Sequence, residues 1–151
     1  TNGVVNPTPQ KYAFPVATPS YYWSVVPMPI GMTGYMGFFS TSATNGLIWM
    51  NSTMGEVSRS SGVRTSGGDV ITINGRVYVA YTAYSGDQKG VMRICDITDG
   101  KYNQIFNYTM EASGANGNGT ASACLMVKNN ELYAVFGCTG SGLYFYRIAC
   151  K

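Results

Sequence analysis

Residues 70–100 contain a strand–turn–strand pattern that constrains the fold of this chain more than any other stretch. An apolar run, residues 70–73, leads into Asn74-Gly75. Asn-Gly is the strongest short signal for a β-hairpin, because both residues tolerate the positive φ angles of a type I′ turn. Two further runs rich in β-branched and aromatic residues follow, at residues 76–81 and 90–95. Such residues favour strands, so the stretch predicts an antiparallel meander.

The same pattern occurs three times along the chain. A turn residue and the glycine after the next loop lie 12 residues apart in the first copy (34 to 46), 15 in the second (75 to 90) and 12 in the third (130 to 142). A glycine-rich insertion, residues 112–120, separates the second and third copies. Apolar residues alternate or run in short bursts and show no helical period. The strands predicted outside the central stretch are residues 35–39, 46–50, 102–108, 123–127, 132–136 and 143–148.

Residues 31–151 are therefore predicted to form one all-β domain of three antiparallel meander repeats, at about 31–57, 69–101 and 121–151. Residues 1–30 differ in kind, because they hold all six prolines of the chain. Proline cannot donate a hydrogen bond within a sheet, so this segment is predicted to be an extended arm. One strand is expected within it, at residues 21–26. The arm either packs along its own domain or reaches a neighbouring subunit.

Two phrases carry a resemblance to a known architecture. Ile-Asn-Gly-Arg-Val-Tyr-Val-Ala at residues 73–80 and the outer strand with its Asp-Ile-Thr-Asp-Gly-Lys turn at residues 90–101 are similar to blades of secreted and cell-surface β-propellers. A repeat in the low forties with about four strands is typical of such blades. The resemblance implies a propeller-like fold over residues 31–151, without the Trp-Asp dipeptide of WD40 repeats or a sialidase-type Asp box. Propellers have four to eight blades, so a β-trefoil and a β-sandwich or jelly roll stay open as alternatives.

Cysteines and sequons indicate where such a chain resides. Only 11% of residues are charged, and the cysteine count is an even four. This composition favours an oxidising compartment and disulfides, although free buried thiols are the alternative. Any of three pairings is compatible with the sequence. We expect an extracellular protein or one on a cell or virion surface, with disulfide candidates Cys95, Cys124, Cys138 and Cys150 and glycosylation sequons at Asn51, Asn107 and Asn118.

Several kinds of chemistry do not fit the sequence. The chain has no histidine, which excludes Ser-His-Asp and Cys-His catalysis and histidine–metal sites. We expect no metal, no cofactor and no enzymatic activity, and we interpret Asp96 and Asp99 as turn residues. The net charge of +3 is scattered and does not favour nucleic acid. No apolar run reaches the roughly 18–20 residues of a membrane-spanning helix. The missing start methionine and signal peptide are typical of a mature product, a fragment or an excised domain.

Aromatic residues are the most informative candidates for binding. Twelve Tyr, six Phe and two Trp are present, and Tyr and Trp combine an apolar body with a polar tip that suits sugars and protein interfaces. We expect a non-enzymatic binding or adhesion module for a glycan or protein. The alternatives are a self-associating structural subunit of a filament, fibre or capsid-like assembly, and part of a glycan-active enzyme. The predicted ligand-binding residues are Tyr22, Trp23, Trp49, Tyr84 and Asp87, with packing as the other role.

Overall fold

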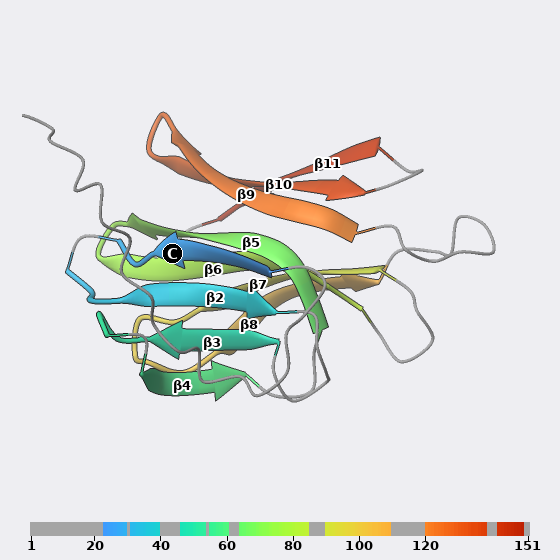
Figure 1. Ribbon diagram of the computed structural model, residues 1–151. Helices are drawn as coiled ribbons and strands as arrows, with labels where there is room; N and C mark the ends of the chain where they lie inside the picture. The colour runs from blue at the N-terminus through green and yellow to red at the C-terminus, as the bar shows by residue number, and fades with distance from the viewer. Residues whose placement is uncertain are drawn as a thin grey trace, which may run out of the picture.

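The computed structural model is all-β, and its described residues form three antiparallel sheets without a helix (Figure 1). None of the described residues belongs to a helix that could span a membrane. The described strands close neither a barrel nor a propeller ring. The structure describes residues 23–29, 31–39, 46–53, 55–60, 64–84, 90–109, 120–138 and 142–149.

Each sheet is a meander in which the strands lie in chain order. The first sheet contains β1 (Trp23–Pro27), β2 (Tyr35–Phe39), β3 (Leu47–Met50) and β4 (Glu56–Ser60). The second sheet contains β5 (Arg64–Ile73), β6 (Arg76–Tyr84), β7 (Gly90–Asp96) and β8 (Asn103–Thr109). The third sheet contains β9 (Thr120–Lys128), β10 (Glu131–Cys138) and β11 (Gly142–Ile148).

The sequence predicts the all-β class and the central meander, and the structure confirms both. It also extends the first and second sheets beyond the prediction. Strand β4, Glu-Val-Ser-Arg-Ser, is polar and half exposed, so it lacks the apolar alternation that identified the other strands. Strand β5 begins at Arg64, before the apolar run, and its first half is rich in glycine and polar residues. Strand β1 lies inside the proline-rich segment and pairs with β2, so the first sheet begins there.

The second and third sheets share the same hairpin turn. Strands β5 and β6 are joined by Asn74 (φ 50°) and Gly75 (φ 73°). Strands β9 and β10 are joined by Asn129 (φ 53°) and Asn130 (φ 59°). Positive φ at both positions is the geometry of a type I′ turn, which suits the twist of the flanking strands. Because both turns have two residues, the two sheets correspond residue by residue.

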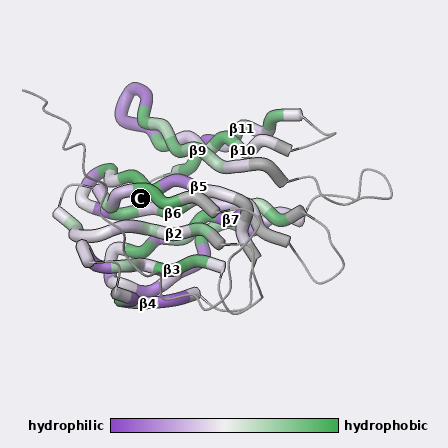
Figure 2. The backbone as a smooth tube through the Cα atoms, in the orientation of Figure 1, coloured by the Kyte–Doolittle hydropathy of each residue, from purple (hydrophilic) through white to green (hydrophobic). Residues whose placement is uncertain are grey.

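The second sheet lies in the middle, with one neighbouring sheet on each face. Val77, Val79 and Tyr81 pack against Phe38 and Leu47 of the first sheet. On the opposite face the second sheet packs against the third through a second buried cluster. Alternation along β6 produces this division, because successive side chains point to opposite faces. Hydropathy along the chain alternates accordingly in several strands (Figure 2). The buried members of the second cluster are Ile73, Tyr78, Ala80, Met92, Ile94, Ala123, Leu125, Leu132, Ala134 and Phe136.

The two outermost sheet faces differ. On the first sheet, Ile48 and Met50 point away from the second sheet and are fully buried, with Val25 and Tyr35 packed against them. On the third sheet, Leu143 and Phe145 on the outer face are 66% and 67% exposed. Ile48 and Met50 are therefore covered on the outer face of the first sheet, whereas Leu143 and Phe145 are open on that of the third.

Candidate functional site

A polar cleft lies where the two hairpin turns approach each other. It has a volume of about 480 Å³, within the range of small-molecule sites. Asn74 lines it from the turn of the second sheet, and Asn130 lines it from the turn of the third. Positive φ is the reason that asparagine suits these positions, since its short polar side chain tolerates the left-handed region. The described residues that line the cleft are Asn74, Asn130, Glu131, Arg147, Ile148 and Ala149.

Two of the lining side chains, Glu131 and Arg147, belong to a hydrogen-bonded chain that also includes Tyr133. The Arg147 guanidinium forms an ion pair with Glu131. The Tyr133 hydroxyl donates to Glu131 Oε2 over 2.6 Å, and this bond to a carboxylate raises the pKa of Tyr133. Tyr133 lies opposite Arg147 in the β10–β11 register, which explains why both reach the same carboxylate. The cleft therefore combines amide, carboxylate and guanidinium groups with a net charge of zero.

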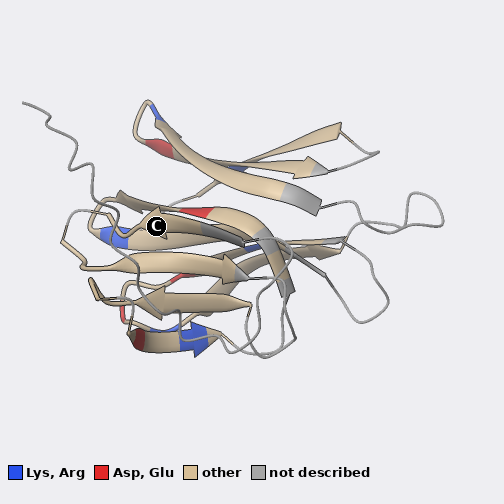
Figure 3. Cartoon of the chain, viewed as in Figure 1, with Lys and Arg blue, Asp and Glu red and all other residues tan. Residues whose placement is uncertain are grey.

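A second hollow lies on the other side of the Asn129–Asn130 turn. Its volume is about 350 Å³, and Met126, Lys128, Asn129 and Tyr133 line it. Tyr133 belongs to this hollow while its hydroxyl bonds to Glu131 of the cleft. The charged residues of the third sheet lie toward this end, as Figure 3 shows. The same turn thus contributes Asn130 to the cleft and Asn129 to the second hollow.

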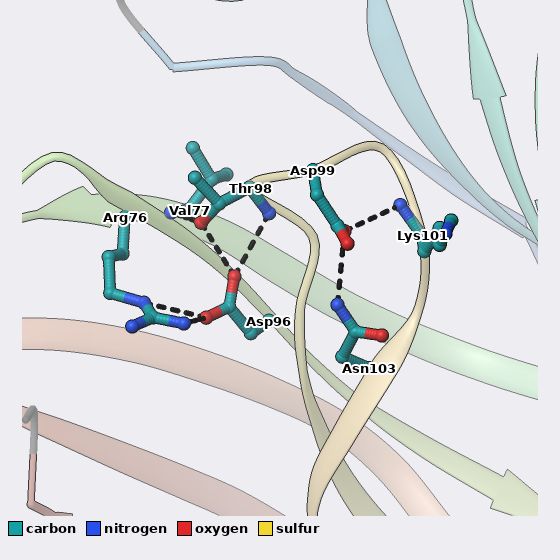
Figure 4. Close-up of polar contacts among 7 residues, drawn as sticks. All are labelled: Arg76, Val77, Asp96, Thr98, Asp99, Lys101 and Asn103. Atoms are coloured by element: carbon teal, nitrogen blue, oxygen red, sulfur yellow. Dashed lines mark hydrogen bonds and ion pairs between the residues drawn. The ribbon is translucent and has the colours of Figure 1, made fainter.

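Asp96 and Asp99 are close in sequence but serve separate turns (Figure 4). Asp96 is only 4% exposed. Its Oδ1 accepts from the Thr98 hydroxyl at 2.6 Å and from the Thr98 N–H at 2.9 Å, and its Oδ2 accepts from Arg76 Nε at 2.7 Å. Asp99 Oδ1 accepts from the Lys101 N–H and from the Asn103 amide, both at 3.0 Å. The interpretation of both residues as turn residues agrees with these contacts.

Hydrogen bonds lower the pKa of both aspartates and so favour the carboxylate form. Burial alone would raise the pKa of Asp96, but the bonds from Thr98 and Arg76 outweigh it and lower the pKa. The Lys101 N–H, followed by the Asn103 amide, lowers the pKa of Asp99. A general acid needs a raised pKa near the working pH. Neither aspartate has that property.

The remaining described carboxylates also have structural partners. Glu56 pairs with Arg59. Asp69 accepts from the N–H of its neighbour Val70 at 2.8 Å and from the Leu125 N–H at 2.9 Å, which ties β5 to β9. Among the described residues, no group of three His, Cys, Asp or Glu side chains is placed to hold a metal ion. Every carboxylate that the structure describes therefore bonds a protein group.

Of the five residues that the sequence predicts to bind a ligand, only Trp49 has a described side chain, and it does not line the cleft. Trp49 is half-buried, packs against the core between the first and second sheets, and donates from its indole N–H to the Thr33 carbonyl at 3.1 Å. The side chains of Trp23 and Tyr84 lie outside the described residues, as do Tyr22 and Asp87. For Trp49, packing is thus the role that the contacts show.

The sequons and cysteines have the following environments. Asn51 is exposed, and its Oδ1 accepts from Thr53 and Gly55. Asn107 is exposed and accepts from Arg93 Nε at 2.9 Å. Among the predicted disulfide candidates, Cys95 is a buried free thiol and Cys124 an exposed one. No predicted pairing that includes either of these two is present. Asn118 and the side chains of Cys138 and Cys150 lie outside the described residues.

The cleft residues escaped the sequence analysis for a specific reason. The sequence places Asn130 in a turn and Arg147 in the last predicted strand, and it carries no local sign that the two residues meet. The sequence does show two equivalent asparagine turns. This predicts two similar hairpin ends, but it does not predict that sheet packing brings them together. Stacking of the second sheet on the third supplies that information. Compared with protein-family models, curated proteins and solved structures, the chain matches none of them, so its function is inferred from its own geometry.

Proposed function

We propose that this protein is a non-enzymatic binding module that holds an uncharged glycan in the cleft between the two asparagine turns. The observation that carries the proposal is the convergence of Asn74, Asn130, Glu131 and Arg147 on one hollow of about 480 Å³ from two different sheets. A few convergent polar groups in a preformed hollow are the usual mark of a small-ligand site.

The chemistry of the lining suits sugar hydroxyls. Each hydroxyl both donates and accepts, and asparagine offers both functions in one plane. Glu131 supplies acceptors, and Arg147 supplies fixed N–H donors. Together these groups match a polyhydroxylated ligand better than an apolar one.

Charge favours a neutral ligand over an anionic one. Among the described residues, Arg147 is the only cation that lines the cleft, and it is paired with Glu131. A phosphate or sulfate would have to compete with this carboxylate and would meet its negative charge. An uncharged glycan meets no such cost. The described carboxylates are all bonded to protein groups, which supports binding without catalysis.

We further propose that the three sheets are consecutive blades of a propeller-like arrangement at a surface or in the extracellular space. The supporting features are the meander order within each sheet, the contact of β5 with β1, β2 and β9, and the shared turn. The exposed sequons Asn51 and Asn107 are consistent with that location. A crystal structure in which the sheets radiate from a common axis would support the arrangement, and a flat sandwich would contradict it.

A glycan array with four variants tests the binding proposal. Asn74→Gly and Asn130→Gly remove a cleft side chain while keeping the positive φ that glycine also adopts, and Arg147→Met removes the guanidinium. Asn129→Gly is the matched control, because Asn129 lies in the same turn but lines the other hollow. We expect at least tenfold weaker binding for the cleft variants and unchanged binding for the control. Failure of the wild type to bind any glycan, or equal binding by all variants, would contradict the proposal.

A further inference from the structure

The outer face of the third sheet is open although the corresponding face of the second sheet is covered. The two asparagine turns and the strand registers relate the sheets residue by residue. The second-sheet face that packs against the third sheet is buried. Its residues Ile71, Tyr78, Ala80, Met92 and Ile94 correspond in that order to Met126, Tyr133, Val135, Leu143 and Phe145. The open face of the third sheet is thus equivalent to the face of the second sheet that another β-sheet covers.

The open face has the size of one side of a protein interface. Met126, Leu143 and Phe145 are 43%, 66% and 67% exposed, and Cys124, Tyr133 and Val135 complete the face. Taking roughly 150–250 Å² for each fully exposed large side chain, these three residues expose on the order of 260–440 Å². A standard interface covers about 800 Å² per partner, of which somewhat more than half is apolar, or about 450 Å². The upper end of the exposed range approaches that share.

We infer that a second copy of this chain covers this face, so that the third sheets of two copies pack face to face across a two-fold axis. Head-to-tail stacking on the first sheet is disfavoured because Ile48 and Met50 on its outward face are already fully buried. A two-fold contact needs only the open face itself, which each copy supplies. Closed two-fold dimers are also the commonest oligomers.

Charge along the face selects an antiparallel arrangement. Lys128, Glu131 and Arg147 are the charged residues of the third sheet, and all lie toward its turn end. The other end carries the uncharged row Ser122, Gly137 and Leu143, which are paired across the three strands. With the two-fold axis perpendicular to the strands, the charged end of each copy lies over the uncharged end of the other. The parallel alternative would place Lys128 of one copy near Arg147 of the other.

The antiparallel arrangement has a measurable signature at the centre of the face. Cys124, Val135 and Phe145 form the middle row of the sheet. With the axis across the strands, β9 lies over β9 and β11 over β11 of the partner. The backbone of each Cys124 then lies over that of its equivalent across sheets spaced roughly 10 Å apart, and each thiol lies at the β9 edge beside the Leu125 carbonyl and Asp69. A short bismaleimide therefore reaches from one Cys124 thiol to the other.

Sedimentation velocity and cross-linking test this inference independently of glycan binding. We expect the wild type to sediment as a dimer of the 16.2 kDa chain at micromolar concentration. Phe145→Asp should raise the dimer Kd at least about 30-fold, as for a central interface residue. Val57→Asp is the matched control, because Val57 is a 53% exposed apolar residue of the first sheet, and it should leave the dimer intact. Circular dichroism verifies that both variants stay folded.

Cross-linking then tests the arrangement. Bismaleimidoethane should join two chains at Cys124, as mapped by peptide mass, and Cys124→Ser should prevent this link without dissociating the dimer. A wild type that is monomeric at every concentration, or a dimer unaffected by Phe145→Asp, would overturn the inference. A dimer that depends on Phe145 but gives no link at Cys124 would overturn the antiparallel arrangement. Loss of the dimer in Phe145→Asp with glycan binding retained would separate this interface from the cleft.

Discussion

At Gly68 the packing of the first sheet on the second leaves no room for a side chain. A Cβ atom placed there would lie 2.3 Å from Phe38 Cε1 and 2.4 Å from the Ala80 carbonyl oxygen. Ordinary contacts at a Cβ begin near 3.4 Å, so Gly68→Ala forces both groups to move by about 1 Å. Phe38 is fully buried, and the Ala80 carbonyl belongs to the neighbouring strand β6, so neither group yields easily.

Two opposing effects set the size of the change. Overpacking a well-packed core costs typically 1–3 kcal/mol, and the backbone contact places this site at the upper end. Replacing glycine by alanine also lowers the conformational entropy of the unfolded chain, which raises the free energy of unfolding by about 0.4–1 kcal/mol. We therefore expect Gly68→Ala to lower the free energy of unfolding by roughly 2 kcal/mol. Urea denaturation followed by tryptophan fluorescence measures this change from the shift in midpoint.

Two further variants make the experiment specific. Gly75→Asn is the matched control, because Gly75 (φ 73°) has open space around it and Asn130 occupies the equivalent turn position. It should change the free energy of unfolding by less than about 0.5 kcal/mol. Phe38→Leu should cost less in the Gly68→Ala background than in the wild type, since the leucine makes room. Wild-type stability of Gly68→Ala would refute the described contact between the two sheets.

Three other substitutions test separate contacts. Asp96→Asn should destabilise the protein by about 1–3 kcal/mol at neutral pH, because it weakens the buried bonds to Thr98 and Arg76. The pKa of Asp96 is lower in the folded than in the unfolded protein. The stability that Asp96 contributes is therefore present above the unfolded pKa near 3.8 and is lost as the pH falls through the folded pKa. In an acid titration, the free energy of unfolding of Asp96→Asn should consequently fall less steeply than that of the wild type. Asp69→Ala should cost about 1–2 kcal/mol and speed hydrogen exchange at the Leu125 amide, which loses its acceptor; unchanged exchange would contradict that link. Thr65→Val should cost about 1 kcal/mol in thermal unfolding, because the buried hydroxyl donates to the Gly46 carbonyl at 2.7 Å, and an unchanged melting temperature would argue against this bond.

Local signals in the sequence predict much of this fold. Asn74-Gly75 and the apolar alternation after it identify the β5–β6 hairpin, and the same reasoning locates the strands of the third sheet. Strand β4 was missed because an edge strand with one polar, half-exposed face has no periodic apolar signal. The polar start of β5 was missed for the same reason.

The cleft and the open face depend on information that local patterns do not carry. Asn74 and Asn130 are more than fifty residues apart in the sequence, and only sheet stacking places them at one hollow. Trp49 is a residue for which the sequence allows both binding and packing, and its described contacts are packing against the core between two sheets and the bond to Thr33. The sequence shows Phe145 only as a residue of a strand. That its face of the sheet is uncovered follows only from the three-dimensional structure.

The most direct test of the proposed function is an NMR titration of the isotope-labelled protein with the strongest glycan from the array. We predict that the side-chain amide resonances of Asn74 and Asn130 and the backbone signals of Glu131 and Arg147 shift together with one Kd, while Asn129 moves less. Shifts confined to residues outside the cleft, such as Tyr84 and Asp87, would contradict the cleft as the binding site.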